Sequence, residues 1–230
     1  MKILALETST KMGSIALTED YNLVGEHQIS IKDSYSEMLL PSIDHLLKSC
    51  DTSIHTIDAL ALAQGPGSFT SLRIGMSVIK GFSLKTKVPV IPIPSLDGLA
   101  HNLCYSNYLV CPLMDARKGE VYTAFYKKKE DYLTKISDDR VLNPEQLMDE
   151  IDEDVVLLGD GALLYKELIQ KRLQGKAHFA PFNLSYPRAS AIAHLAFEKI
   201  KTATVLQNSA LLTPLYVRRP EAEVKWGKSR

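Results

Sequence analysis

Residues 63–75 read Ala-Gln-Gly-Pro-Gly-Ser-Phe-Thr-Ser-Leu-Arg-Ile-Gly, and this stretch is the most informative part of the chain. It extends an apolar segment that begins at Ala59, turns at Gly-Pro-Gly and continues into helix-forming residues. This order predicts a strand, a tight loop and a helix N-terminus, which together can hold an anion on free backbone N–H groups. Neither common nucleotide fingerprint fits, because a dinucleotide loop needs a third glycine where Thr70 stands and a Walker A loop ends in Gly-Lys-Ser/Thr.

A second polar loop lies near the N-terminus, between an apolar run at residues 2–6 and an alternating run at residues 14–18. The pattern predicts a β-hairpin with a hydroxyl-rich tip, followed by a third strand at residues 23–29. The predicted loops supply seven candidate positions for binding a nucleotide or another anion: Glu7, Thr8, Ser9, Gly65, Gly67, Ser68 and Asp115.

Two long amphipathic helices are predicted in the first half of the chain. The first begins at the capping box of residues 34–37, continues to Cys50 and contains Pro41, which should kink it. The second covers residues 69–86 and places these residues on one stripe: Leu72, Gly75, Met76, Ile79, Phe82 and Ser83. Gly75 and Gly81 each cost about 1 kcal/mol of helix propensity, which suggests that another backbone approaches closely.

The second half repeats the theme of the first. Each half has an apolar strand, an acid (Glu7, Asp115), a short turn, a glycine (Gly13, Gly119) and an alternating strand. This pattern favours an internal duplication, although strand–turn–strand is common enough to recur by chance. Further strands are expected at residues 88–93, 108–114, 120–126 and 155–158, and further helices at 95–103, 144–151, 162–173 and 188–200. We therefore expect an α/β protein with domains at residues 1–105 and 106–230, the second ending in a basic tail.

Composition bounds the class of protein. The 230 residues carry 27 basic and 27 acidic side chains, and a net charge of zero argues against broad nonspecific binding of nucleic acid. Cys50, Cys104 and Cys111 lack C-x-x-C spacing and are expected to be reduced thiols. No apolar run reaches membrane-spanning length and no signal-peptide pattern opens the chain, so we expect a cytoplasmic protein with no membrane partner.

The paired acids have two interpretations. Glu7 and Asp115 stand at corresponding strand ends, which face each other in a duplicated nucleotide-cleft fold and would anchor a metal–phosphate site. Alternatively, each carboxylate caps its own turn by accepting hydrogen bonds from the backbone. Both interpretations stay open for Asp115, and capping is favoured for Glu7. Ser68 follows a tight turn, but without an identifiable base it is expected to cap the second helix.

Other chemical motifs are weak. The six histidines include no i, i+4 pair and none neighbours a cysteine pair, so no zinc site is expected. Gly227-Lys228-Ser229 imitates the end of a Walker A loop, but no helix can follow it at the chain end. We interpret it as part of a basic tail.

Five segments carry a resemblance to a known family. They are Leu-Ala-Leu-Glu-Thr-Ser-Thr at 4–10, Tyr-Ser-Glu-Met-Leu-Leu-Pro at 35–41, the loop and helix start at 65–75, Met-Asp-Ala-Arg-Lys-Gly-Glu-Val-Tyr at 114–122, and Tyr-Val-Arg-Arg-Pro-Glu-Ala at 216–222. Over essentially its whole length the chain resembles the TsaB (YeaZ) family, the bacterial partner of TsaD in making threonylcarbamoyladenosine on tRNA. The resemblance implies two ribonuclease-H-like lobes of the actin/Hsp70/sugar-kinase (ASKHA) type, the second reduced.

The resemblance also implies a non-catalytic role. TsaD carries two metal-binding histidines four residues apart on its first helix, and the matching positions here are Tyr35 and Leu39, so neither a metal nor a catalytic residue is expected. The two anion loops would then be vestigial. Three residues depart from the family pattern: Glu7 replaces the usual Asp, Tyr35 a frequent His, and Ser71 a frequent Gly. No cofactor is expected in the isolated chain, and ATP or ADP is expected only in the assembled complex.

Homologues pair through the first two helices, either with TsaD or with themselves. The expected partners are therefore TsaD and TsaE, with tRNA bound indirectly through the complex and a homodimer when the chain is alone. Small residues at positions 75, 77 and 81 would admit a partner helix. The partner-binding surface is expected on Tyr35, Met38, Leu39, Ser42, Leu46, Arg73, Met76, Ser77 and Lys80. The alternative for each position is that it fills the chain's own core.

Three functions compete. The first is a non-catalytic scaffold that activates TsaD, with TsaE, for threonylcarbamoylation of the adenosine 3′ to the anticodon. The second is an ATP-binding phosphotransferase-like or metallopeptidase-like enzyme of the same superfamily, although fold alone does not give function. The third is direct binding of tRNA through basic residues of the tail: Arg218, Arg219, Lys225, Lys228 and Arg230.

Overall fold

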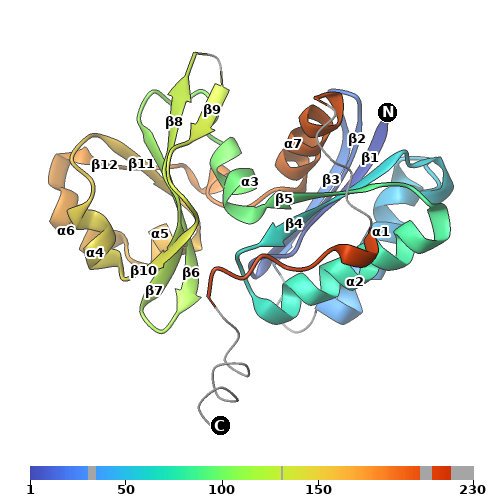
Figure 1. Cartoon of the computed structure of the whole chain (residues 1–230), viewed down its shortest axis with the longest axis horizontal. Coiled ribbons are helices and arrows are strands. Elements are labelled where there is room, and N and C mark those ends of the chain that lie inside the picture. Colours follow the sequence, from blue (N-terminus) through green and yellow to red (C-terminus); the bar gives the residue numbers. More distant parts are fainter. Residues whose placement is uncertain (31–34, 131, 203–208, 219–230) are drawn as a thin grey trace, which may run out of the picture.

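Two β-sheets with flanking helices make up the molecule (Figure 1). The structure is a computed structural model that describes residues 1–30, 35–130, 132–202 and 209–218. The first sheet has the strand order β3-β2-β1-β4-β5, and the second has the order β10-β7-β6-β11-β12, with β8 beside β6 and β9 beside β8.

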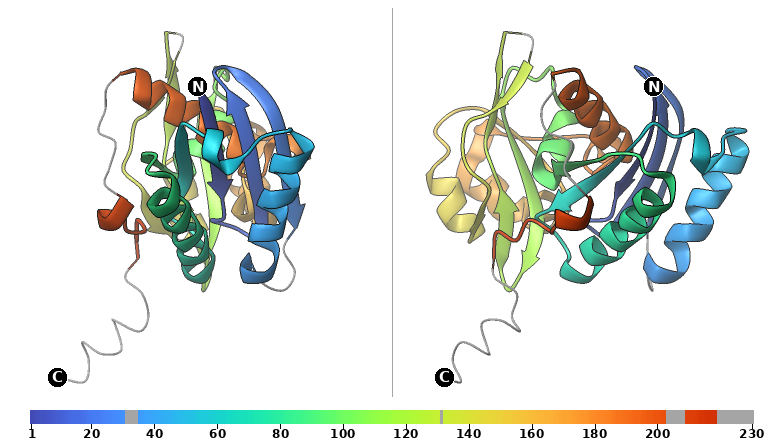
Figure 2. Two further views of the ribbon diagram at one scale, coloured as in Figure 1. Left: turned by 90° about the vertical axis from the view of Figure 1, so that its right-hand side faces the viewer. Right: turned by 45° about the vertical axis from the view of Figure 1, so that its right-hand side comes forward.

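The first sheet begins with the predicted antiparallel hairpin and third strand. These strands are β1 (Lys2–Glu7), β2 (Met12–Glu19) and β3 (Asn22–Ser30), and β4 (Ala59–Gly65) and β5 (Val90–Pro94) join in parallel. β1 and β4 are apolar on both faces because helices cover both faces of the sheet. α1 and α2 lie on one side of the sheet and α7 on the other (Figure 2). Leu4 belongs to the core beneath α1 and α2, whereas Ile3 belongs to the core beneath α7.

Three helices of the first half follow the predicted pattern. α1 spans Tyr35–Ser49 with Pro41 inside it, α2 spans Phe69–Thr86 and α3 spans Ser95–His101. The predicted capping residue Ser34 lies outside the described residues. α2 buries the predicted stripe except for Phe82, which is half-buried. None of the helices in the described part of the chain is long and apolar enough to span a bilayer.

The second sheet contains more strands than predicted. Its strands are β6 (Leu109–Arg117), β7 (Glu120–Thr123), β8 (Tyr126–Lys129), β9 (Tyr132–Lys135), β10 (Arg140–Leu142), β11 (Val155–Leu158) and β12 (Ala177–Phe179). Its helices are α4 (Pro144–Asp149), α5 (Asp160–Leu164) and α6 (Lys166–Leu173). Short 3-10 helices are η1 (Ile54–Thr56), η2 (Gln174–Lys176), η3 (Phe182–Leu184) and η4 (Ser209–Leu211).

Three predictions about the second half were wrong in detail. The single strand at 120–126 is two strands, because Phe125 leaves the ladder and its backbone bonds with Ser137 and Ile136. The single helix at 162–173 breaks at Tyr165, because α5 packs on β6 whereas α6 packs on α4. The turn after Asp115 is shorter than predicted, because β6 continues to Arg117.

A helix from the end of the chain returns to the first sheet. α7 (Ala189–Lys201) buries Ile192, Ala193 and Ala196 against β1, β2, β4 and β5. Its first turn is tied to the first sheet, since the backbone N–H of Ala189 donates to the Ser14 hydroxyl over 3.0 Å. A division of the chain at residue 105 therefore separates the strands of the two sheets. α7, however, belongs to the second segment of the chain and packs on the first sheet.

Residues 209–218, which we call the strap, run from the first lobe to the second (Figure 1). Leu212 is buried in the core beneath α1 and α2. The Leu215 N–H donates to the Gln64 carbonyl over 2.8 Å, so the strap lies against the end of β4. Beyond it, the Arg218 guanidinium donates to the Glu120 carboxylate and the Ala116 carbonyl in the β6–β7 hairpin.

Candidate functional site

The hairpin tip and the Gly-Pro-Gly loop, predicted separately as anion loops, meet in the structure. The Ser68 N–H donates to the Ser9 carbonyl over 2.7 Å. A Cβ on Gly67 would lie 2.4 Å from that same carbonyl oxygen, so only glycine allows the approach. Gly65 has a φ of 121° and donates its N–H to the Ser95 hydroxyl over 3.1 Å. Six of the seven candidate loop residues, all except Asp115, therefore lie on these two adjoining segments.

Glu7 caps its own turn, as the favoured interpretation expects. Its Oε1 accepts the Ser9 N–H over 2.6 Å, and the residue has no solvent exposure. Burial raises the pKa of the Glu7 carboxyl to about 7, because a charged carboxylate in this position loses its hydration. Within the described part of the chain, neither Oε2 of Glu7 nor the Ser9 hydroxyl has a hydrogen-bond partner.

Asp115 belongs to a different set of contacts. Its Oδ1 accepts the Arg117 N–H over 2.8 Å, and its own N–H donates to Asp160 Oδ1 over 3.0 Å. Arg117 and Lys118 both have positive φ, so the carboxylate stabilises a strained turn. This geometry supports the capping interpretation for Asp115 as well. Across residues 1–30, 35–130, 132–202 and 209–218, no group of three or more His, Cys, Asp or Glu side chains could hold a metal ion.

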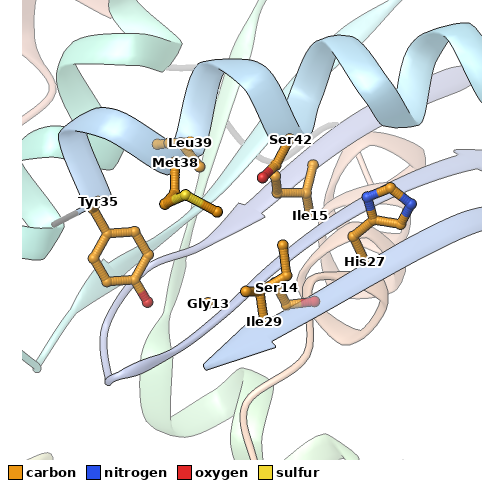
Figure 3. Close-up of a pocket in the computed structure, with 9 residues that line it drawn as sticks. All are labelled: Gly13, Ser14, Ile15, His27, Ile29, Tyr35, Met38, Leu39 and Ser42. Atoms are coloured by element: carbon orange, nitrogen blue, oxygen red, sulfur yellow. The ribbon is translucent and has the colours of Figure 1, made fainter. Parts of the chain in front are cut away.

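Tyr35 seals the space above the hairpin (Figure 3). Its hydroxyl donates to the Thr10 carbonyl over 2.7 Å, and its ring lies so close to Gly13 that a Cβ there would be 2.8 Å from Cε1. The remaining cavity has a volume of about 10 Å³, which is room for one water molecule. Burial raises the pKa of the phenol, and the nearby Glu7 charge adds to this. Leu39, on the next turn of α1, also lies in the core.

Ser68 occupies the N-cap position of α2 but does not cap it. Its side chain accepts no hydrogen bond from the helix backbone. Instead, the Ser68 and Ser71 hydroxyls pair over 2.9 Å. Ser71, one of the departures from the family pattern, therefore provides the partner that draws Ser68 away from its predicted capping role.

The expected partner surface divides into buried and accessible residues. Five of the nine residues are buried, as the alternative expectation of a core position has it: Tyr35, Leu39, Ser42, Leu46 and Met76. Met38, Arg73, Ser77 and Lys80 keep accessible surface. For these last four the expectation stays a prediction. The other five are almost completely buried, although Tyr35 and Leu39 line the groove described next.

A groove of about 430 Å³ lies between α1 and α2. Its lining is mainly apolar and includes Leu39, Leu40, Ile74 and Val78, with Arg73 midway along the α2 side. Gly75 does not line it, because Gly75 faces inward, where a Cβ would lie 2.4 Å from the Thr8 hydroxyl oxygen. The predicted close contact at Gly75 is therefore present, but the neighbour is Thr8 of the same chain and not a partner helix.

Two residues that contact Arg73 were missed at the sequence level. Phe69 and Tyr216 stack with ring centroids 5.3 Å apart, and the Arg73 guanidinium lies 3.9 Å from the centroid of the Phe69 ring. Arg73 Nε donates to the Tyr216 hydroxyl over 3.1 Å. The segment that contains Tyr216 contributed to the family resemblance. No sequence pattern, however, links Tyr216 to Arg73, because the two residues are 143 positions apart.

A family model, a curated relative and a solved structure all match most of this chain. The family described as tRNA N6-adenosine threonylcarbamoyltransferase (TsaD) matches residues 23–226. The tRNA threonylcarbamoyladenosine biosynthesis protein TsaB of Bacillus subtilis (strain 168) is 33% identical over all of both chains. The solved structure of YeaZ from Pseudomonas aeruginosa has a TM-score of 0.80 at 27% identity and covers 94% of this chain and 99% of its own.

A more distant structure supports the fold alone. Component A of the (R)-2-hydroxyglutaryl-CoA dehydratase of Acidaminococcus fermentans has a TM-score of 0.52 at 10% identity, over 87% of this chain and 99% of its own. Together with the YeaZ structure, it confirms the predicted α/β fold of the ASKHA type.

Proposed function

This chain belongs to the TsaB (YeaZ) family, and from that premise we propose that it is a non-catalytic subunit that binds and activates TsaD in tRNA threonylcarbamoyladenosine biosynthesis. TsaD, assisted by TsaE, then modifies the adenosine 3′ to the anticodon. The observation that carries the proposal is the similarity to a TsaB protein over the whole length of both chains. A cytoplasmic location follows from this role, because that is where tRNA is modified.

The residues at the hairpin support a non-catalytic role. The two positions that would match metal-binding histidines hold Tyr35 and Leu39, whose side chains are buried. The Tyr35 hydroxyl is committed to the Thr10 carbonyl, and one Glu7 oxygen is committed to the Ser9 N–H. These groups hold the loop in shape instead of facing a substrate.

The groove between α1 and α2 supports docking of a partner on this face. Leu40, which lines the groove, is 51% exposed, so an apolar side chain on this face is accessible to a partner. Among the described residues, nothing lies within 4 Å of where a Cβ on Gly81 would be, so this position of α2 leaves room for a partner. TsaD is the proposed occupant, and a second copy of the chain takes its place when TsaD is absent. We further propose that tRNA binds only through the complex and that ATP or ADP binds only there.

Reconstitution tests this function. The purified chain should be inert alone, and adding it should switch on tRNA modification by TsaD and TsaE supplied with threonylcarbamoyl-adenylate. Ser77→Trp, an exposed position on the groove, should abolish the gain, whereas Lys129→Trp on the second sheet should keep it. A rate no higher than that of TsaD and TsaE alone would contradict the proposal.

The enzyme alternative has its own test. Calorimetry of the isolated chain with ATP and magnesium should show no binding, and incubation should show no nucleotide turnover. Tight binding with turnover would instead favour a phosphotransferase-like activity.

A further inference from the structure

α2 carries positive charge only. Its sequence contains no aspartate or glutamate and three cations, which are Arg73, Lys80 and Lys85. Arg73 and Lys80 are seven residues apart and therefore lie on the same side of the helix. Within the described residues, no carboxylate lies within ion-pair distance of either of these two side chains. Among the described residues, this part of the proposed docking face therefore carries positive charge that no carboxylate compensates.

Arg73 is held in one orientation although it is exposed. The Phe69 ring lies 3.9 Å beneath its guanidinium, and its Nε donates to the Tyr216 hydroxyl over 3.1 Å. An arginine fixed in this way loses less conformational entropy when it binds a ligand. Its two terminal amino groups have no acceptor within the described residues.

Tyr216 is itself positioned by the strap. The preceding residue, Leu215, is joined to β4 through its N–H, and Leu212 is anchored in the core. The Tyr216 ring also stacks on Phe69. The orientation of Arg73 is therefore fixed by two segments that are 143 residues apart. A surface arginine that only interacts with water would not need such support.

The surroundings of Arg73 favour a carboxylate over a phosphate. The groove that Arg73 borders has an apolar lining that includes Leu39, Ile74 and Val78. A guanidinium–carboxylate pair at such an edge is less screened by water and can use two parallel N–H bonds. A nucleic-acid site would instead need several cations along a polar surface, and the whole chain has a net charge of zero.

We propose that Arg73 is a preorganised receptor for one carboxylate of the partner subunit and that Tyr216 is its positioning residue. The inference rests on the proposed function, since the groove must receive a protein. The partner segment that it describes is a helix with an aspartate or glutamate among apolar residues. The apolar side chains enter the groove between α1 and α2, and the carboxylate receives both terminal amino groups of Arg73.

Titration of the full chain against TsaD tests this proposal with four variants. Arg73→Ala should weaken the affinity about 10- to 100-fold, because a carboxylate at the interface loses its partner. Arg73→Lys should recover part of that loss, since lysine keeps the charge but not the paired N–H groups. Tyr216→Phe should weaken binding about 3-fold by releasing Nε. Lys85→Ala removes an exposed charge from the last turn of the same helix and should change little.

The outcomes separate the inference from the function on which it rests. If wild-type chain does not bind TsaD, both fail. If wild-type chain binds but Arg73→Ala behaves like Lys85→Ala, with both variants folded by circular dichroism, the receptor role alone is overturned. Substituting the carboxylates of TsaD one at a time should reveal one that couples to Arg73 in a double-mutant cycle. A loss confined to binding of tRNA, with TsaD affinity unchanged, would also overturn the proposal.

Discussion

Glu7 is a carboxyl group that is fully removed from solvent at the tip of the first hairpin. One oxygen accepts the Ser9 N–H, but the other has no partner within the described residues. Such a group costs free energy when it is charged, and protonation relieves that cost. The hairpin tip is therefore expected to be more stable at lower pH, which is the reverse of the usual behaviour of a carboxylate.

The pH dependence can be measured on Glu7→Gln. Burial raises the pKa of Glu7 from 4.5 to about 7, so between these pH values the native state holds a proton that the unfolded state has lost. Stability must then fall as the pH rises through this window, by about 3 kcal/mol in total. The neutral glutamine lacks this dependence, so urea unfolding should show the variant gaining about 2.5 kcal/mol on wild type from pH 5 to pH 8.

Glu19→Gln is the control for this experiment, because Glu19 is exposed at the end of β2. It should change stability by the same small amount at both pH values. Other groups that titrate in this range, including His101, whose pKa burial lowers to about 4, are common to wild type and variant and cancel. Parallel pH profiles for wild type and Glu7→Gln would show that Glu7 is charged in the native state.

Two glycines of α2 have opposite surroundings. Gly75 faces Thr8, whereas Gly81 has no described residue within 4 Å of where its Cβ would lie. We expect Gly75→Ala to lower the free energy of unfolding by about 1–2 kcal/mol, because the new Cβ would lie 2.4 Å from the Thr8 hydroxyl oxygen. Gly81→Ala should raise it by about 0.5–1 kcal/mol, since alanine favours the helix and meets nothing. Urea unfolding of both variants checks the pair.

The effect at Gly75 should depend on its neighbour. Adding Thr8→Ala to Gly75→Ala should return part of the lost stability, because the clashing hydroxyl is gone. If Gly75→Ala is as stable as Gly81→Ala, the packing of α2 on the hairpin does not require a glycine at position 75.

The elements with long, regular patterns could be predicted from the sequence. α2 has its predicted bounds, because a strand, a Gly-Pro-Gly loop and an 18-residue amphipathic run leave few alternatives. β9, β10 and β12 were missed, since each has only three or four residues, too few to show a period. The break at Tyr165 could not be foreseen either, because it depends on which neighbours α5 and α6 pack against.

At the site, the sequence identified residues better than it identified their neighbours. The hydrogen bond from Ser9 to Glu7 follows from turn chemistry, which acts over two residues. The burial of Leu46 and Met76 could not be separated from exposure at an interface, because both situations favour the same apolar residues. Tyr216 acts on Arg73 from another part of the chain, so no local pattern points to it.

The strap holds the two lobes together from the surface. Leu212 and Leu211 form a matched pair, since they are 1% and 76% exposed. Leu212→Ala should lower the free energy of unfolding by about 2–4 kcal/mol, and Leu211→Ala should change it little. Hydrogen exchange should also show faster exchange of the Leu215 N–H, which bonds to Gln64, in the first variant. Equal effects of the two substitutions would mean that the strap is not anchored at Leu212.

The first lobe requires residues from the far end of the chain. A fragment of residues 1–105 lacks α7 and exposes the apolar face that includes Ile3, Ala5, Ile91 and Ile93. We expect this fragment to aggregate, and a fusion of residues 1–105 to 186–218 through a Gly/Ser linker to unfold cooperatively in urea. Cooperative unfolding of 1–105 alone would show that the helix is dispensable.

The return of α7 also bears on how the protein is made. A ribosome releases the five strands of the first sheet well before it reaches Lys201. At an elongation speed of about 5–20 residues per second, this leaves the nascent sheet with one bare side for roughly 5–20 s. During that interval the nascent chain exposes an apolar surface that can bind other nascent chains on the same messenger RNA. Chaperone dependence of its synthesis in cells would be the visible consequence.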